Sequence, residues 1–232
     1  MRAGRGAPQL TLGLFDSPAH DFASFVVGPN GEACGALKRW AAGTGPRVIL
    51  LRGAHASGKS HLLEAAVRAV ERGRAMLVPL RTLAQDASSV LNELDDIEFL
   101  ALDDIDSVAG RLETERALFN VYNAAAAGER RLLWSVTSAA GFSLADLSSR
   151  LAAGLAYNVR ELGDSGKADV LVAEAARRGL QLSPAVVDFI LQRERRDLAT
   201  LLVALDRLDR ATLARGRAPS VPFVRAVLSE EA

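Results

Sequence analysis

The stretch Gly53-Ala54-His55-Ala56-Ser57-Gly58-Lys59-Ser60 decides the fold, because it matches the phosphate-loop pattern Gly-x4-Gly-Lys-Ser/Thr at every fixed position. Given the composition of this chain, about 0.002 matches to that pattern are expected by chance. An apolar run at residues 47–52 precedes the loop and is typical of a buried strand, and residues 61–70 follow it with helical spacing. The alternative, a plain glycine-containing turn between a strand and a helix, does not require the full pattern.

Strand, loop and helix together predict a nucleotide site. Gly53, Ser57 and Gly58 form the cradle, in which backbone N–H groups and the helix N-terminus hold phosphate. Lys59 reaches the outer phosphates, and the Ser60 hydroxyl binds Mg²⁺.

A second motif supports the first. An apolar run at residues 98–102 leads into Asp103-Asp104-Ile105-Asp106, which places carboxylates at the end of a buried strand. In phosphate-loop proteins the first acid of such a pair holds Mg²⁺ through water and the next one polarises the attacking water. We therefore assign Asp103 to the metal and Asp104 to catalysis, with a simple helix cap as the alternative.

Alternating strands and helices predict the architecture. Further strands are expected at 75–80, 132–137 and 156–160, with a helix at 114–127 between two of them. We expect an α/β fold with a five-stranded parallel sheet covered by helices. After Gly163 the pattern becomes wholly helical, with Ser183-Pro184 starting one helix, and this predicts a small C-terminal all-helical lid domain.

Composition narrows the class of protein. The chain has 232 residues, 28 Lys+Arg against 28 Asp+Glu, and a single cysteine, Cys34. A neutral chain is a poor candidate for holding nucleic acid by charge alone, so we expect any DNA contact to be indirect. A lone cysteine cannot form an internal disulfide, no apolar run approaches the length of a membrane span, and residues 1–8 lack the apolar stretch of a signal peptide. We therefore expect a cytoplasmic protein.

Several segments match one family in order. Phe22-Ala23-Ser24-Phe25-Val26-Val27-Gly28-Pro29-Asn30 is similar to the adenine-side entry segment of the bacterial initiator DnaA, and the phosphate loop with His61 and the Leu-Asp-Asp-Ile turn are similar to its nucleotide motifs. The chain therefore resembles the DnaA branch of the AAA+ superfamily. The resemblance implies an AAA+ P-loop domain that binds ADP or ATP with Mg²⁺, with Val26, Val27 and His61 among the nucleotide contacts.

Two further features resemble the Hda subgroup, the regulatory inactivators of DnaA. The sequence has no helix-turn-helix domain after the lid, and Gln9-Leu10-Thr11-Leu12-Gly13-Leu14-Phe15 is similar to peptides that dock into the sliding clamp. The resemblance implies three units, namely a clamp-binding segment at 1–18, the AAA+ domain at 19–163 and the helical lid at 164–232. The alternative for Leu10, Leu12, Leu14 and Phe15 is an N-terminal strand packed on the chain's own domain.

The resemblance also implies a function. Such a protein binds the sliding clamp, the DNA polymerase III beta subunit, and reaches DNA and the nucleoid only through it. There it stimulates ATP hydrolysis by DnaA through an arginine finger and prevents re-initiation. Arg150, in Leu147-Ser148-Ser149-Arg150-Leu151, matches the finger segment, and its alternative role is an arginine on a solvated helix face. A homodimer that masks Arg150 is conceivable.

Two departures from the family pattern bear on whether the chain hydrolyses ATP itself. Ala139 stands where the family carries a sensor aspartate. Ala199 stands where it carries a sensor arginine, and Arg195 and Arg196, three or four residues earlier, are the alternatives for that contact. We therefore expect weak or no intrinsic ATPase, a tolerance for ADP, and a regulator of hydrolysis in another protein. The alternative functions are an AAA+ ATPase acting as a helicase loader or transposition helper, and a diverged initiator.

Overall fold

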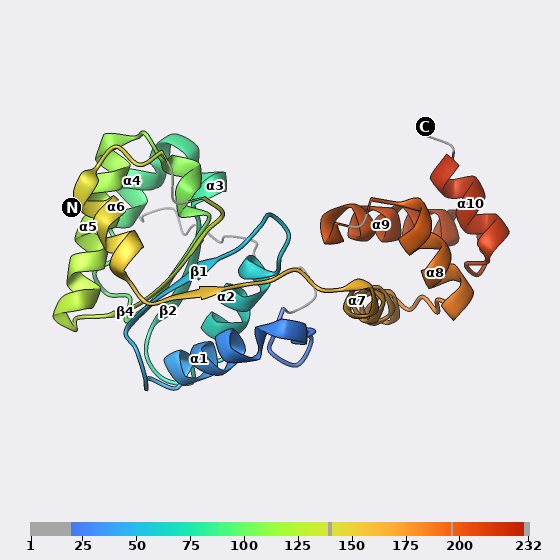
Figure 1. Cartoon of the computed structure of the whole chain (residues 1–232), viewed down its shortest axis with the longest axis horizontal. Coiled ribbons are helices and arrows are strands. Elements are labelled where there is room, and N and C mark those ends of the chain that lie inside the picture. The colour runs from blue at the N-terminus through green and yellow to red at the C-terminus, as the bar shows by residue number, and fades with distance from the viewer. Residues whose placement is uncertain (1–19, 139–140, 196, 230–232) are drawn as a thin grey trace, which may run out of the picture.

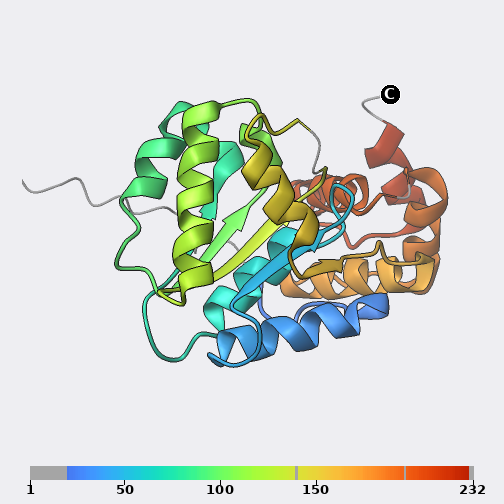
Figure 2. The ribbon, with the colours of Figure 1, turned by 60° about the vertical axis from the view of Figure 1, so that its left-hand side comes forward.

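The computed structural model describes residues 20–138, 141–195 and 197–229. The expected clamp-binding residues Gln9 to Phe15, the sensor position Ala139 and Arg196 lie outside the described residues. The chain forms an α/β base and a bundle of helices beside it (Figures 1 and 2). The expected fold class is confirmed.

The base is built on one parallel sheet with the strand order β2-β3-β4-β1-β5. The strands are β1 (Val48–Arg52), β2 (Ala75–Pro79), β3 (Phe99–Asp103), β4 (Arg131–Val136) and β5 (Ala156–Asn158). β3 and β4 are buried along their whole length, as expected for central strands of a parallel sheet that is covered on both faces. The phosphate loop follows β1. The acidic motif begins with Asp103, the last residue of β3, and β4 lies between these two strands.

Helices cover both faces of the sheet. One face packs against α1 (Gly31–Ala41) and α2 (Lys59–Arg68), where Leu37, Trp40 and Leu63 are fully buried. The other face packs against α4 (Ala87–Asn92), α5 (Leu112–Ala127) and α6 (Ala145–Ala153). The shorter helical turns are η1 (Gly28–Asn30), α3 (Leu80–Leu83), η2 (Ala84–Asp86) and η3 (Ile105–Val108).

The fifth strand is shorter than the predicted 156–160. β5 ends at Asn158, the Val159 N–H still donates to the Arg52 carbonyl of β1, and both backbone groups of Arg160 bind the side chain of Asn30. The Arg160 N–H donates to Asn30 Oδ1 at 2.8 Å, and Asn30 Nδ2 donates to the Arg160 carbonyl at 3.0 Å. The buried Asn30 therefore ties the segment after β5 to the start of α1.

The lid is a separate bundle with its own apolar core. It comprises α7 (Asp164–Arg177), α8 (Pro184–Arg193), α9 (Leu198–Arg215) and α10 (Val221–Ser229). Ser183 precedes α8 with proline in its first turn, as the sequence predicts. Asp197 caps α9 by accepting the Thr200 N–H at 2.9 Å. In the described part of the chain, no helix combines the length and apolarity needed to span a bilayer.

Candidate nucleotide-binding site

The phosphate loop occupies residues 53–58, between the end of β1 and the start of α2. Gly58 has a φ of 101° and Ala56 a φ of 58°, so the loop turns through the left-handed region twice. A Cβ on Gly53 would lie 2.5 Å from the Val159 carbonyl oxygen. Glycine is therefore required sterically at position 53 and conformationally at position 58.

Lys59 lies folded into this loop. Its side chain is only 5% exposed, and Nζ donates to the carbonyls of Gly53 at 2.9 Å and Ala54 at 2.8 Å. The third acceptor is the Thr137 hydroxyl at 3.2 Å, at the end of β4. Burial lowers the pKa of Lys59, and the negative charges of Asp104 and Asp103 oppose that shift.

The residues present fit a phosphate group. Ser57 is 6% exposed, and within the described residues its Oγ is a buried polar atom without a hydrogen-bond partner. An oxygen-rich anion in the loop would give this hydroxyl an acceptor, and it would also face the N-terminus of α2 and the Lys59 ammonium group. The cradle, the cation and the unpaired hydroxyl thus point to the same kind of ligand.

Asp103 and Ser60 meet where a magnesium ion is expected. Asp103 is the last residue of β3, is 7% exposed, and accepts hydrogen bonds from the hydroxyls of Ser135 and Ser60. Burial raises the pKa of this carboxyl, and the two hydroxyl donors lower it. The described residues contain no cluster of three or more His, Cys, Asp or Glu that could hold a metal alone. Mg²⁺ would therefore depend on Ser60, Asp103, phosphate oxygens and water.

Asp104, the acid that the sequence assigns to the attacking water, lines the cavity and binds an arginine. Its backbone has a φ of 53°, and its N–H donates to Asp103 Oδ1 at 3.1 Å and to Ser135 Oγ at 2.9 Å. Its carboxylate forms an ion pair with Arg81, with Nε and Oδ2 2.8 Å apart. The sequence interpretation missed Arg81, which follows β2 and is adjacent to the acidic turn only in the folded chain.

The backbone of Thr137 and Ser138, directly after β4, is bound by a carboxylate from η3. Asp106 accepts the backbone N–H groups of Thr137 and Ser138, each at 3.2 Å. The family pattern would place an aspartate at position 139, beside these residues. A carboxylate from η3 therefore binds the two residues that directly precede position 139 in the sequence.

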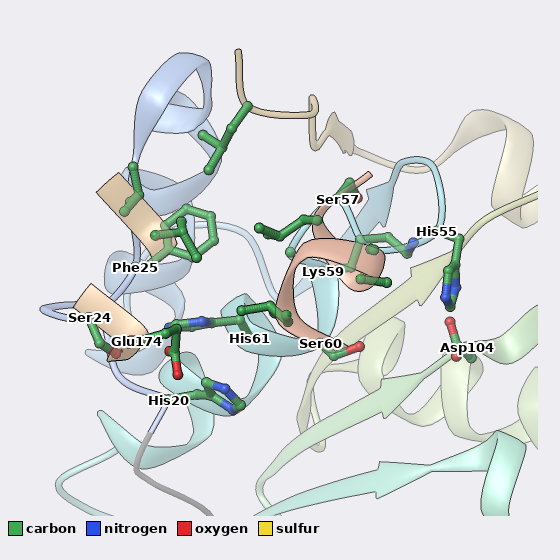
Figure 3. A pocket seen from close by; sticks show the side chains of 18 residues that line it. His20, Ser24, Phe25, His55, Ser57, Lys59, Ser60, His61, Asp104 and Glu174 are labelled. Carbon is green, nitrogen blue, oxygen red and sulfur yellow. Dashed lines mark hydrogen bonds between the residues drawn. The ribbon is translucent and has the colours of Figure 1, made fainter. Parts of the chain in front are cut away.

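A cavity of about 290 Å³ extends from the loop to the lid (Figure 3). The base contributes polar and aromatic residues, and the lid side contributes mostly apolar ones. The lining residues are His20, Ser24, Phe25, Val26, His55, Ala56, Ser57, Gly58, Lys59, Ser60, His61, Asp104, Leu162, Val170, Glu174, Leu198, Ala199 and Leu202. Of the two predicted valines, Val26 lines the cavity, whereas Val27 is 41% exposed and is not among the lining residues.

An aromatic cluster forms one wall of the cavity. The ring of His61 lies 4.5 Å from that of His20 and 5.1 Å from that of Phe25, between ring centroids. His61 Nε2 lies 3.0 Å from the Asp21 carbonyl, and His20 Nδ1 lies 2.8 Å from Glu64 Oε2. Figure 3 shows His20, His61 and the lid residue Glu174 grouped on this wall. Such a wall suits a flat, partly apolar ring.

The lid brings no cation to the cavity among its described residues. Ala199, the position of the expected sensor arginine, does line the cavity. Arg195 is 89% exposed and lies 3.7 Å from the Asp197 carboxylate. The described lid residues therefore leave the contact of the family's sensor arginine unreplaced.

Arg150 lies outside the residues that line this cavity. It is exposed on α6, and its guanidinium carbon lies 5.7 Å from the centroid of the Tyr122 ring. Tyr122 in turn stacks on Trp134, with centroids 5.5 Å apart. Arg150 forms no ion pair with a described carboxylate, so its charge is available at the surface.

Comparison with known proteins shows which families and structures this chain is similar to. The Hda lid-domain family model matches residues 164–228. A protein of Haemophilus influenzae, itself named only as an uncharacterized protein, is 39% identical over 179 residues, covering 75% of this chain and 78% of the relative. Domain III of the Thermotoga maritima replication initiation protein DnaA has a TM-score of 0.80 at 20% identity, covering 92% of this chain and 97% of that one. AMPPCP-bound DnaA from Aquifex aeolicus has a TM-score of 0.70 at 20% identity, covering 87% and 68%.

The parallel sheet, the phosphate loop and the helical lid define a DnaA-related AAA+ protein. The sequence relationship goes further than the fold. The Hda lid-domain match over residues 164–228 and the DnaA-like fold together identify the chain as an Hda-related protein, a DnaA-related AAA+ replication regulator.

The half-buried His61 predicts a pH dependence of stability. Burial lowers the pKa of His61 below its ordinary 6.5, so the unfolded chain binds a proton that the folded chain does not. The free energy of unfolding should therefore fall as the pH drops below about 6.5. Urea unfolding between pH 7.5 and 5.5 should show a smaller loss for His61→Gln than for the wild type. The exposed His55 supplies the control, and His55→Gln should follow the wild type; equal losses in all three proteins contradict the prediction.

Proposed function

We propose that this protein binds the sliding clamp and stimulates ATP hydrolysis by DnaA, with Arg150 acting as an arginine finger in the nucleotide site of DnaA. The observation that carries the proposal is the exposed Arg150 guanidinium, which rests on an aromatic ring without a described acidic partner. Turning DnaA off in this way prevents re-initiation of chromosomal replication. Family membership supports DnaA as the partner.

The chemistry of the proposal depends on the shape and charge of the guanidinium group. Charge spreads over the phosphoryl oxygens as ATP is cleaved, and a planar fork of N–H donors matches those oxygens. Arginine fingers supplied by a partner contribute on the order of 10³–10⁵ in rate. Arg150 would enter the site of another subunit, since it does not line its own cavity.

The chain's own site would act as a nucleotide-dependent scaffold. We assign phosphate binding to Gly53, Ser57, Gly58 and Lys59, and base contacts to His61, Val26 and Val27. Bound Mg²⁺, held by Ser60 and Asp103, would neutralise phosphate charge. ADP or ATP would fill the cavity, and the related AMPPCP-bound DnaA structure supports a nucleotide ligand.

Intrinsic hydrolysis is proposed to be weak for two reasons. The described lid residues bring no cation to the cavity, and Arg81 engages Asp104, the acid assigned to the attacking water. Residues 1–18 would hold the clamp, residues 19–163 would bind nucleotide, and residues 164–232 would close over it. The protein would act in the cytoplasm, associated with the nucleoid through the clamp.

Replacing the finger should abolish stimulation without affecting recruitment. Arg150→Ala removes the positive charge from the surface of α6 and should reduce stimulation of DnaA-dependent ATP hydrolysis by at least about 10³-fold. Hydrolysis is measured with radiolabelled ATP on DnaA in the presence of clamp loaded on DNA. Arg116→Ala, at an exposed arginine on the neighbouring α5, is the matched control and should retain stimulation. Unchanged stimulation in Arg150→Ala would refute the finger assignment.

The clamp contact is tested separately in the N-terminal segment. Gln9→Ala/Leu12→Ala removes the edge hydrogen bond and one apolar anchor, and should reduce retention on immobilised sliding clamp at least about tenfold. Thr11→Ala changes the intervening variable position and should bind like the wild type. A wild-type chain that is not retained by the clamp contradicts this assignment and favours the helicase-loader class.

A further inference from the structure

The start of α6 is tied to a buried carboxylate from another helix. Glu115 of α5 is fully buried, and its Oε1 accepts the N–H groups of Gly110 at 2.7 Å and Ser143 at 3.0 Å. Its Oε2 accepts the N–H of Leu144, the residue before α6, at 2.6 Å. Leu144 offers no side-chain cap, so Glu115 supplies both the acceptor and the negative charge that a helix N-terminus favours.

The end of α6 is tied to a cation from the sheet. The guanidinium of Arg52, the last residue of β1, donates to the carbonyl of Leu151. Leu151 belongs to the last turn of α6, where carbonyls lack partners within the helix and positive charge is favourable. Opposite charges from two distant parts of the chain thus match the two ends of the dipole of this one helix.

Between these ties, α6 is packed on one side and exposed on the other. Leu147 and Leu151 are buried in the core beneath α5, and Figure 2 shows the two helices side by side. Arg150 is exposed on the flank of α6 that faces Tyr122 of α5, and it directly precedes Leu151, whose carbonyl Arg52 binds. Any shift along or about the axis of α6 would therefore move Arg150 directly.

We propose that Glu115 and Arg52 are positioning residues for Arg150, fixing α6 at both ends so that the guanidinium is presented in one place. The inference rests on the proposed finger function. Catalytic groups must be held to a fraction of an ångström, and a displacement of about 1 Å can cost on the order of 10²-fold in rate. Arg52 also directly precedes the phosphate loop, so the C-terminal tie begins at the nucleotide site.

The test compares stimulation of DnaA hydrolysis by Glu115→Gln and Arg52→Met. Glutamine keeps one acceptor but turns an amide donor towards the Leu144 N–H, and methionine removes the donor to Leu151 while keeping an unbranched side chain. Each variant should lose stimulation at least about tenfold, with nucleotide affinity and clamp retention at wild-type levels. Arg52→Lys keeps the positive charge and an N–H donor group, so it should stimulate hydrolysis better than Arg52→Met does. Glu113→Gln, at an exposed glutamate in the first turn of α5, is the control and should stimulate normally.

A second readout does not involve DnaA. Amide hydrogen exchange of residues 147–151 should become faster in Glu115→Gln and in Arg52→Met, whereas the buried part of α5 should exchange as in the wild type. A uniform increase over the base, or a loss of nucleotide binding that matches the loss of stimulation, would mean a general structural role and would overturn the inference.

The outcomes separate the inference from the function on which it rests. Wild-type stimulation by Arg150→Ala contradicts the finger itself. If Arg150→Ala loses stimulation while Glu115→Gln and Arg52→Met keep both wild-type stimulation and wild-type exchange, the positioning role is wrong and the finger stands. If Glu115→Gln does not fold, Arg52→Met and Arg52→Lys decide between the same two results.

Discussion

The buried ammonium group of Lys59 is the interaction on which the site depends. It links the loop carbonyls of Gly53 and Ala54 to the Thr137 hydroxyl directly after β4, so it joins the ends of the neighbouring strands β1 and β4 next to the phosphate cradle. Burying a cation is unfavourable unless polar partners surround it, and the nearby Asp103 and Asp104 offset part of that cost. A nucleotide phosphate would compensate the same charge. Lys59 thus connects the loop to the end of β4 and lies close enough to the acidic turn to feel its charge.

The nucleotide cavity and the proposed arginine finger lie in different parts of the protein. Its cavity has a phosphate loop and an aromatic wall, but the described lid lines it with Glu174 and apolar residues and not with a cation. Arg150, which is exposed and has no acidic partner among the described residues, lies instead on α6, outside the cavity. This distribution of charge agrees with a regulator that completes the site of a partner.

The sequence predicted the sheet, the phosphate loop, the end of β3 and the lid, because each has a local pattern of apolar spacing or fixed residues. It could not predict Arg81 beside Asp104, Asp106 at the backbone of Thr137 and Ser138, or Glu115 at the start of α6, since these contacts join segments about 20 to 30 residues apart. The predicted strand at 156–160 was too long, and the sequence could not indicate that the backbone of Arg160 binds the side chain of Asn30, 130 residues earlier. Local patterns indicated which segments build the site, whereas long-range polar contacts determine how its side chains are held.

The most direct test of the account is calorimetric titration of the full chain with Mg²⁺ and ADP or ATP. The wild type should bind at least one of the two nucleotides with a saturable isotherm, and Lys59→Met should weaken that binding at least about 100-fold because it removes the cation facing the phosphates. Lys38→Met, at an exposed lysine on α1 outside the cavity, should bind as the wild type does. Wild-type affinity in Lys59→Met, or no binding of either nucleotide by the wild type, would contradict the account.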